Sequence, residues 1–116
     1  MVRAIILAAG LYLAAAASTS AQKDDRYLAG TVWQPECERN ESSCTHFVAG
    51  LITAHAIIAQ MHPEARLYCA DTRVTVGQIR RIAIEYMRRN PKFLHLNFEF
   101  IVFRSVAEAF PCPKGK

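Results

Sequence analysis

The chain has 116 residues, of which 52% are hydrophobic and 21% charged, so it has room for one small domain with a single modest core. Its 14 Lys and Arg against 10 Asp and Glu leave a formal net charge of +4. That excess is small and is not interleaved with aromatic side chains, as nucleic-acid-binding faces are. The composition therefore excludes a multidomain protein and argues against a nucleic-acid partner.

The first 21 residues have the layout of a signal peptide. Met1–Arg3 is a short positive segment, Ala4–Ala17 is an apolar run, and Thr19–Ala21 supplies small residues before a cut. The apolar run is too short to span a bilayer comfortably. We therefore expect residues 1–21 to be removed, and residues 22–116 to form a single exported domain that is not attached to a membrane.

Four cysteines remain in this domain: Cys37, Cys44, Cys69 and Cys112. An even number in a short exported chain indicates two disulfides, because the compartment is oxidising and the core alone is thin. Four cysteines allow three pairings, and their positions in the sequence do not by themselves choose among them.

The first predicted helix starts at Asp24 or Asp25, where acidic side chains favour the helix dipole. Gly30 lowers the helix propensity of this segment. Pro35 should bend or end the helix near Gln34, because a proline in a helix interior removes a backbone hydrogen bond.

The second predicted helix starts at Ser43 or Cys44 and ends at Gln60. Its apolar positions nearly surround it: Phe47, Val48, Leu51, Ile52, Ala54, His55, Ile58 and Ala59. We therefore expect it to be the most central helix. Gly50 within it predicts the close approach of a neighbouring helix.

The clearest predicted helix begins after its N-cap Thr75 and stops at Asn90, before Pro91. Thr75 and Gln78 are spaced as a capping box, and a residue before Pro91 is pushed out of the helical region. One side is apolar: Val76, Ile79, Ile82, Ala83, Tyr86 and Met87. The other side is charged: Arg80, Arg81, Glu85, Arg88 and Arg89. This basic side is either a solvated face or a surface for an acidic partner.

After a single turn that follows Pro91, the last predicted helix runs from Leu96 to Ala109. Its candidates for burial are Phe100, Ile101, Phe103, Val106, Ala107 and Phe110. The alternation in Leu94–Phe100 also fits a strand, but a lone strand would have nothing to pair with, so we favour a helix.

These elements predict an all-α fold, a small bundle of about four helices with two disulfides. If the helices run up, down, up and down with short connections, Cys37 and Cys44 share one pole, and Cys69 and Cys112 share the other. Only the pairing of 37 with 44 and of 69 with 112 is then within reach of a disulfide.

The chain contains no recognisable catalytic motif, so we expect that the protein is not an enzyme and binds no cofactor. The four histidines are His46, His55, His62 and His95. Because no cysteine or acid is spaced to complete a ligand set with them, we expect no metal site. We interpret His55 as a locally bonded core or boundary residue, and His46 and His62 as exposed.

The second half of the chain carries a series of short motifs: Cys69, Thr75, Gly77 and Gln78 in the pattern C-x5-T-x-G-Q, then Asn90-Pro91, Leu94-His95, Ala107, Ala109 and Phe110-Pro111-Cys112-Pro113. Earlier in the chain, Cys44 precedes Phe47, Gly50 and Leu51. In these motifs the chain resembles the Rap/Tai family of type VI secretion immunity proteins, whose second helix is also led by a cysteine. The resemblance covers about three quarters of the mature chain.

The resemblance implies a periplasmic protein that sequesters and inhibits a peptidoglycan-amidase toxin, its cognate secreted effector. A homodimer of this protein is one of the expected oligomeric states, with a monomer as the other. We expect partner contacts on the basic helix face and on the segment after it, at Arg80, Arg81, Arg88, Arg89, Phe93 and His95. The alternative is a small periplasmic stress chaperone or an envelope structural factor, which would share the same disulfide-bonded helical architecture.

Overall fold

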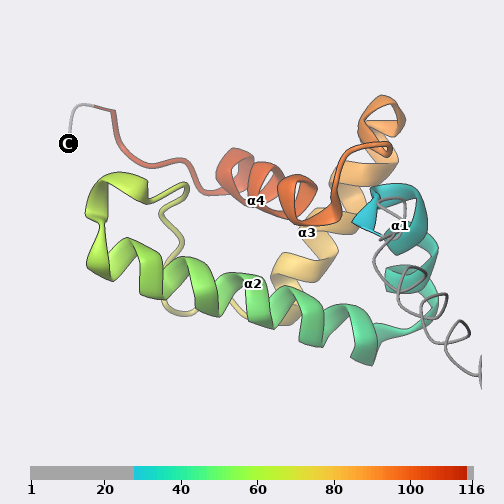
Figure 1. Cartoon of the computed structure of the whole chain (residues 1–116), viewed down its shortest axis with the longest axis horizontal. Helices are drawn as coiled ribbons and strands as arrows, with labels where there is room; N and C mark the ends of the chain where they lie inside the picture. Colours follow the sequence, from blue (N-terminus) through green and yellow to red (C-terminus); the bar gives the residue numbers. More distant parts are fainter. Residues whose placement is uncertain (1–27, 115–116) are drawn as a thin grey trace, which may run out of the picture.

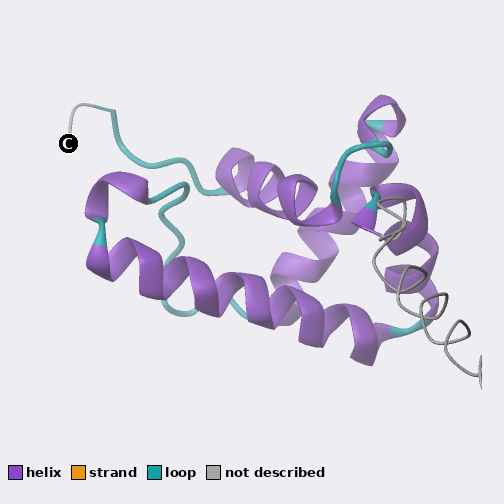
Figure 2. Cartoon of the chain, viewed as in Figure 1, coloured by secondary structure: helices purple, strands orange, loops and turns teal. Residues whose placement is uncertain are grey.

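The computed structural model describes residues 28–114. Within them lie four α-helices and two short 3-10 turns, with no regular strand (Figures 1 and 2). Their bounds are α1 Gly30–Arg39, α2 Glu41–Met61, η2 Pro63–Ala65, α3 Val76–Arg89, η3 Pro91–Phe93 and α4 Phe98–Ala109. The predicted all-α fold is confirmed, while the predicted signal peptide at 1–21 lies outside the described residues.

Helix α1 runs past Pro35, so the predicted end near Gln34 is wrong. Because Pro35 has no backbone N–H, the Thr31 carbonyl, four residues earlier, is the only one that loses its helical hydrogen bond. Both residues are exposed, so water can satisfy that carbonyl. Trp33 and Cys37 are buried and hold the helix on either side of the proline.

The first turn of α1 is held by the loop that precedes α4. The backbone N–H of Gly30 donates to the Leu96 carbonyl and that of Thr31 to the Leu94 carbonyl, both at 2.9 Å. These bonds satisfy donors that have no partner inside a helix. A Cβ at Gly30 would lie 2.5 Å from Cδ1 of Ile101 and 3.1 Å from the Leu94 oxygen. The start of α1 is therefore fixed by contacts with the loop before α4, and it lies later in the chain than predicted.

Helix α2 is not the central helix that its apolar sequence predicts. Its buried residues are only Cys44, Val48, His55 and Ala59. Ile57, Ile58 and Met61 remain 53%, 49% and 70% exposed. No neighbouring atom lies within 4 Å of a Cβ built at Gly50, so the predicted close approach there is also wrong. With 21 residues, α2 extends past the shorter helices, and its far end packs against η2 (Figure 1).

All four helices contact one another, and α3 is the most central because its contacts with the other three are the most extensive. Its buried residues are Ile79, Ala83, Ile84, Tyr86 and Met87. The Thr75 hydroxyl accepts a hydrogen bond from the Gln78 N–H at 3.1 Å, as the predicted cap requires. At the other end, the Asn90 side chain donates to the Tyr86 carbonyl at 2.9 Å. The amphipathic helix with well-defined ends, rather than the apolar one, occupies the middle.

Helix α4 begins at Phe98, slightly later than predicted. Asn97 forms an isolated antiparallel bridge with Ala29, so the alternating segment contributes a single residue of strand pairing. The buried residues recur at helical spacing: Phe98, Ile101, Val102, Ser105 and Val106. Phe100 falls outside these positions and is 48% exposed, so its predicted burial is wrong.

Three aromatic rings from three helices form the centre of the core. The Trp33 ring centroid of α1 lies 4.4 Å from that of Phe47 in α2 and 5.3 Å from that of Phe98 in α4. Phe47 and Phe98 are 5.6 Å apart. Such pairs add to the free energy of apolar burial, so this trio ties the helices together.

Both predicted disulfides are present. Cys37 pairs with Cys44, with α-carbons 4.9 Å apart, and Cys69 pairs with Cys112, with α-carbons 4.8 Å apart. The first joins α1 to the start of α2. The second joins the loop after η2 to the segment that follows α4. The predicted pairing of 37 with 44 and of 69 with 112 is therefore confirmed.

Candidate partner-binding surface

Arg80 is a structural contact, not part of an exposed face as predicted. Its side chain is only 13% exposed. One guanidinium nitrogen donates to the Cys37 carbonyl at 3.0 Å, and another lies 3.5 Å from the Glu41 carboxylate. Arg80 therefore braces the turn between α1 and α2, which is also closed by the Cys37–Cys44 disulfide.

The outward arginines of α3 are largely paired with acids from other helices. The Arg88 Nε donates to Glu38 of α1 at 3.0 Å. Arg89 lies 3.8 Å from Glu85 and 3.5 Å from Glu108 of α4. The sequence showed only Glu85 near these arginines, because the other acids arrive through folding. Such exposed pairs contribute about 0–1 kcal/mol each, but they neutralise much of the predicted basic face.

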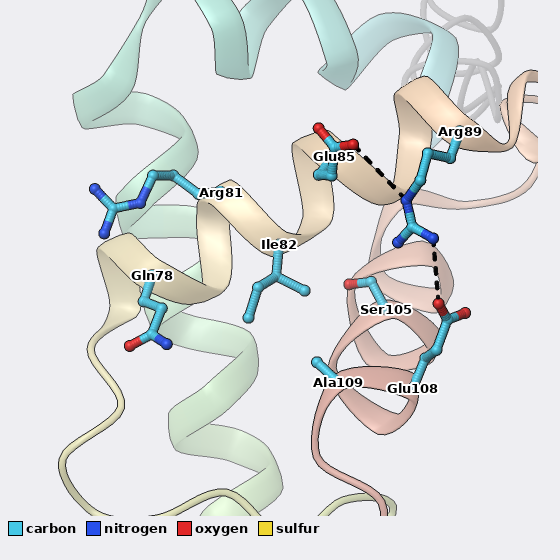
Figure 3. A pocket seen from close by; sticks show the side chains of 8 residues that line it. All are labelled: Gln78, Arg81, Ile82, Glu85, Arg89, Ser105, Glu108 and Ala109. Carbon is cyan, nitrogen blue, oxygen red and sulfur yellow. Dashed lines mark hydrogen bonds and ion pairs between the residues drawn. The ribbon is translucent and has the colours of Figure 1, made fainter.

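Two shallow grooves flank the outward side of α3. The groove toward α4 has a volume of about 410 Å³, and the one toward α1 about 470 Å³. Figure 3 shows the first, which is lined by Gln78, Arg81, Ile82, Glu85, Arg89, Ser105, Glu108 and Ala109. The second is lined by Glu38, Arg80, Arg81, Ile84, Glu85 and Arg88. Arg81 and Glu85 line both grooves and form the ridge between them.

The groove in Figure 3 combines an apolar lining with charged side chains. Ile82 and Ala109 supply apolar contact, and the chain Glu85–Arg89–Glu108 forms a charged border. Ser105 is 2% exposed, and its hydroxyl donates to the Val102 carbonyl of its own helix at 2.7 Å. That hydroxyl is engaged within its own helix, so the groove offers mainly shape and charge to another molecule.

Phe93 and His95 lie between α3 and α4, as predicted, but in different environments. His95 is exposed. Phe93 is partly buried against the core and stacks on Tyr86 with centroids 6.5 Å apart. The Lys92 ammonium and the Arg104 guanidinium lie 5.1 Å and 5.3 Å from the Phe93 ring centroid.

Arg104 was missed by sequence reasoning. It is an isolated arginine on α4, and only the path of the chain between α3 and α4 brings its guanidinium over the Phe93 ring. The exposure of Phe100 was the other missed feature. The helical spacing of the buried residues from Phe98 onward, counted from the true helix start, would have revealed it.

His55 is a buried structural residue, as predicted. Its Nε2 accepts a hydrogen bond from the Leu67 N–H at 3.0 Å, and its ring stacks on Tyr68 with centroids 4.1 Å apart. Burial lowers the pKa of the imidazole, and the nearby Arg66 guanidinium lowers it further. A neutral imidazole is the form that can accept this bond.

Within residues 28–114 no group of three or more His, Cys, Asp or Glu side chains could hold a metal ion.

Exposed apolar side chains gather at the far end of α2 and in the loop after it. These residues, the α2 patch, are Ile57, Ile58, Met61 and Leu67. By length and composition alone α2 could cross a membrane. Its buried Cys44 and His55 instead tie it into the helical domain, through the disulfide and the bond to the Leu67 N–H.

The family model of the Rap1a immunity proteins matches residues 14–112. No curated protein and no solved structure gives a significant match. The family match spans all four helices and both disulfides, and it agrees with the resemblance noted in the sequence. The chain therefore belongs to the Rap1a immunity protein family.

Proposed function

We propose that this protein is a periplasmic immunity factor that binds a peptidoglycan-amidase effector of the type VI secretion system and blocks its active site. The observation that carries the proposal is membership of the Rap1a immunity protein family. Two closed disulfides suit an oxidising compartment, and the signal-peptide layout of residues 1–21 suits export to the periplasm.

The surface proposed for the effector is the outward side of α3 with the segment after it. The predicted contact residues that remain exposed or partly exposed are Arg81, Arg88, Arg89, Phe93 and His95. Arg81 forms no ion pair with residues 28–114, so its guanidinium is available at the ridge between the two grooves. Arginine beside an apolar groove is a common anchor in protein interfaces.

Co-expression tests the proposal. Each secreted amidase effector encoded in the source genome is directed to the periplasm of a bacterial host, with and without this protein, and lysis is followed by optical density. We expect rescue by the full chain with one of these effectors, and none by a chain beginning at Gln22 behind a start methionine, which stays in the cytoplasm. Lysis by every effector despite equal periplasmic amounts of the full chain would contradict the proposed function.

A second candidate function, a periplasmic chaperone, is favoured by the α2 patch. Ile57 and Met61 are 53% and 70% exposed, and exposed apolar surface of this kind can hold unfolded chains. The measurement is light scattering of a reduced, aggregating client protein in the presence of this one. Suppression by the wild type that is lost in Met61→Ser would favour the chaperone, and scattering unchanged by the wild type would remove it.

A further inference from the structure

The acidic side chains of the domain are almost all engaged by internal ion pairs. Of the acids in residues 28–114, Glu99 has no basic partner within 4 Å, and Glu64 has only His62, which is charged only when protonated. The others pair with arginines: Glu36, Glu38, Glu41, Asp71, Glu85 and Glu108. The net positive charge of residues 28–114 therefore comes from the basic side chains that form no ion pair in the folded domain. These are Arg66, Arg81, Lys92, Arg104 and Lys114.

Two of these cations converge on one ring. Lys92 Nζ and Arg104 Cζ lie 5.1 Å and 5.3 Å from the centroid of Phe93. A contact with the face of an aromatic ring positions a cation but uses few of its N–H donors. Lys92 and Arg104 are both exposed, so those donors face solvent. Their charges are held in place without being neutralised.

Exposed apolar and aromatic surface lies beside these cations. Phe100 is 48% exposed and stands four residues before Arg104, on the same side of α4. His95, also exposed, lies on the loop between Phe93 and α4. We name this set the Phe93 patch: Lys92, Phe93, His95, Phe100 and Arg104. Aromatic rings with arginine are the composition that interface hot spots favour.

We propose that the Phe93 patch, rather than the paired arginines of α3, is the main anchor for an acidic protein surface. Resting on the proposed function, we assign that surface to the amidase effector. Carboxylates of the effector bind Arg104 and Lys92, and an apolar side chain between them packs on Phe100. Arg104 can hold a carboxylate through two parallel hydrogen bonds, whereas the guanidinium of Arg88 already holds Glu38 at 3.0 Å.

The first test needs no effector. The mature, disulfide-bonded protein, labelled with ¹⁵N, is titrated with a synthetic peptide of alternating Glu and Phe, and with a matched peptide of Lys and Phe. We expect backbone shifts at Lys92, Phe93, Phe100 and Arg104 with the acidic peptide only, weakening severalfold between 50 and 300 mM salt. Shifts centred on Arg88 and Arg89, or an equal response to both peptides, would overturn the proposal.

The second test measures effector affinity, using the amidase that the co-expression experiment identifies. Arg104→Glu and Arg88→Glu make the same change in net charge. We expect Arg104→Glu to weaken binding about tenfold or more and Arg88→Glu less than about threefold. Phe100→Ser is compared in the same way with Ile57→Ser, a similarly exposed apolar residue of α2. Equal losses within either pair would overturn the assignment.

Three measurements separate the ways in which these tests can fail. Wild-type protein that binds no amidase contradicts the proposed function, while the peptide titration still decides whether the patch prefers acidic partners. Melting temperatures within about 2 °C of the wild type exclude misfolding. Light scattering after gel filtration detects a second copy of the chain on the patch, and a wild-type dimer that Arg104→Glu converts to monomer would also overturn the assignment.

Discussion

The packed half of the molecule and the far end of α2 are held together by different physics. In the packed half, α1, α3, α4 and the start of α2 enclose the rings of Trp33, Phe47 and Phe98. In the distal arm, residues 55–75, the buried residues are His55, Ala59 and Tyr68, whereas η2 contains no buried residue and the α2 patch faces solvent. Apolar burial stabilises one half, and a few specific contacts hold the other.

Two contacts hold the distal arm together, and a third ties it to the segment after α4. The His55 imidazole accepts from the Leu67 N–H, the Tyr68 ring stacks on His55, and the Cys69 N–H donates to the Phe110 carbonyl at 2.9 Å beside the Cys69–Cys112 disulfide. Each contact depends on a single residue or bond. Substitutions in the packed half should therefore destabilise the whole domain, whereas those in the arm should act locally.

The largest effect is expected for Phe98→Ala. Phe98 is fully buried between Trp33 and Phe47, so truncation leaves a cavity at the centre of the core. We expect the free energy of unfolding to fall by about 3–5 kcal/mol, measured by urea denaturation with circular dichroism. A loss below about 1 kcal/mol would contradict the central role of the aromatic trio.

The double substitution Cys69→Ser and Cys112→Ser is expected to come next. The bridge closes a loop with a sequence separation of 43, which the chain-entropy account values at about 4 kcal/mol, less whatever structure the open arm retains. We expect a loss of 2–4 kcal/mol, with hydrogen exchange accelerated first in the arm. Acceleration that begins equally in α3 would show that the two halves unfold together.

A smaller effect is expected from the pH. Because the folded-state pKa of His55 lies below its ordinary value of 6.5, the unfolded chain binds the proton more readily. The stabilisation is therefore complete above about pH 6.5 and is lost as the pH falls toward and through the lowered pKa.

Amide exchange at Leu67, followed from pH 7.5 to pH 5 and corrected for intrinsic exchange, measures this loss. We expect about 1 kcal/mol of local protection to disappear, the worth of one hydrogen bond. His55→Phe should keep the ring contact with Tyr68 but remove the acceptor and the pH dependence together. His46→Phe, at an exposed histidine, is the control and should leave both unchanged.

The smallest effect is expected for Met61→Ser. Met61 is 70% exposed, so the change should alter the free energy of unfolding by less than about 0.5 kcal/mol. Val48→Ala in the packed half of the same helix, where the side chain is fully buried, should cost about 1–3 kcal/mol in the same urea titration. Similar losses at the two positions would remove the distinction between the halves of α2.

The candidate surface was only partly predictable from the sequence. The sequence correctly placed a row of arginines on one helix and Phe93 and His95 just after it. It could not show that Glu38 and Glu108 neutralise Arg88 and Arg89, because ion pairs across helices depend on how the helices pack. The unpaired Arg104 beside Phe93 emerged for the same reason.

Local signals in the sequence determined α3, from the Thr75 cap to the stop before Pro91, because caps and prolines act through bonds to nearby residues. The cysteine spacing with an alternating bundle likewise determined the disulfide pairing. Only the tertiary structure decided where α1 begins, which helix is central and which cations stay unpaired. Those features depend on contacts between residues far apart in the chain. The hydrophobic periodicity of one segment does not show how far that helix will extend beyond the helices that pack against it.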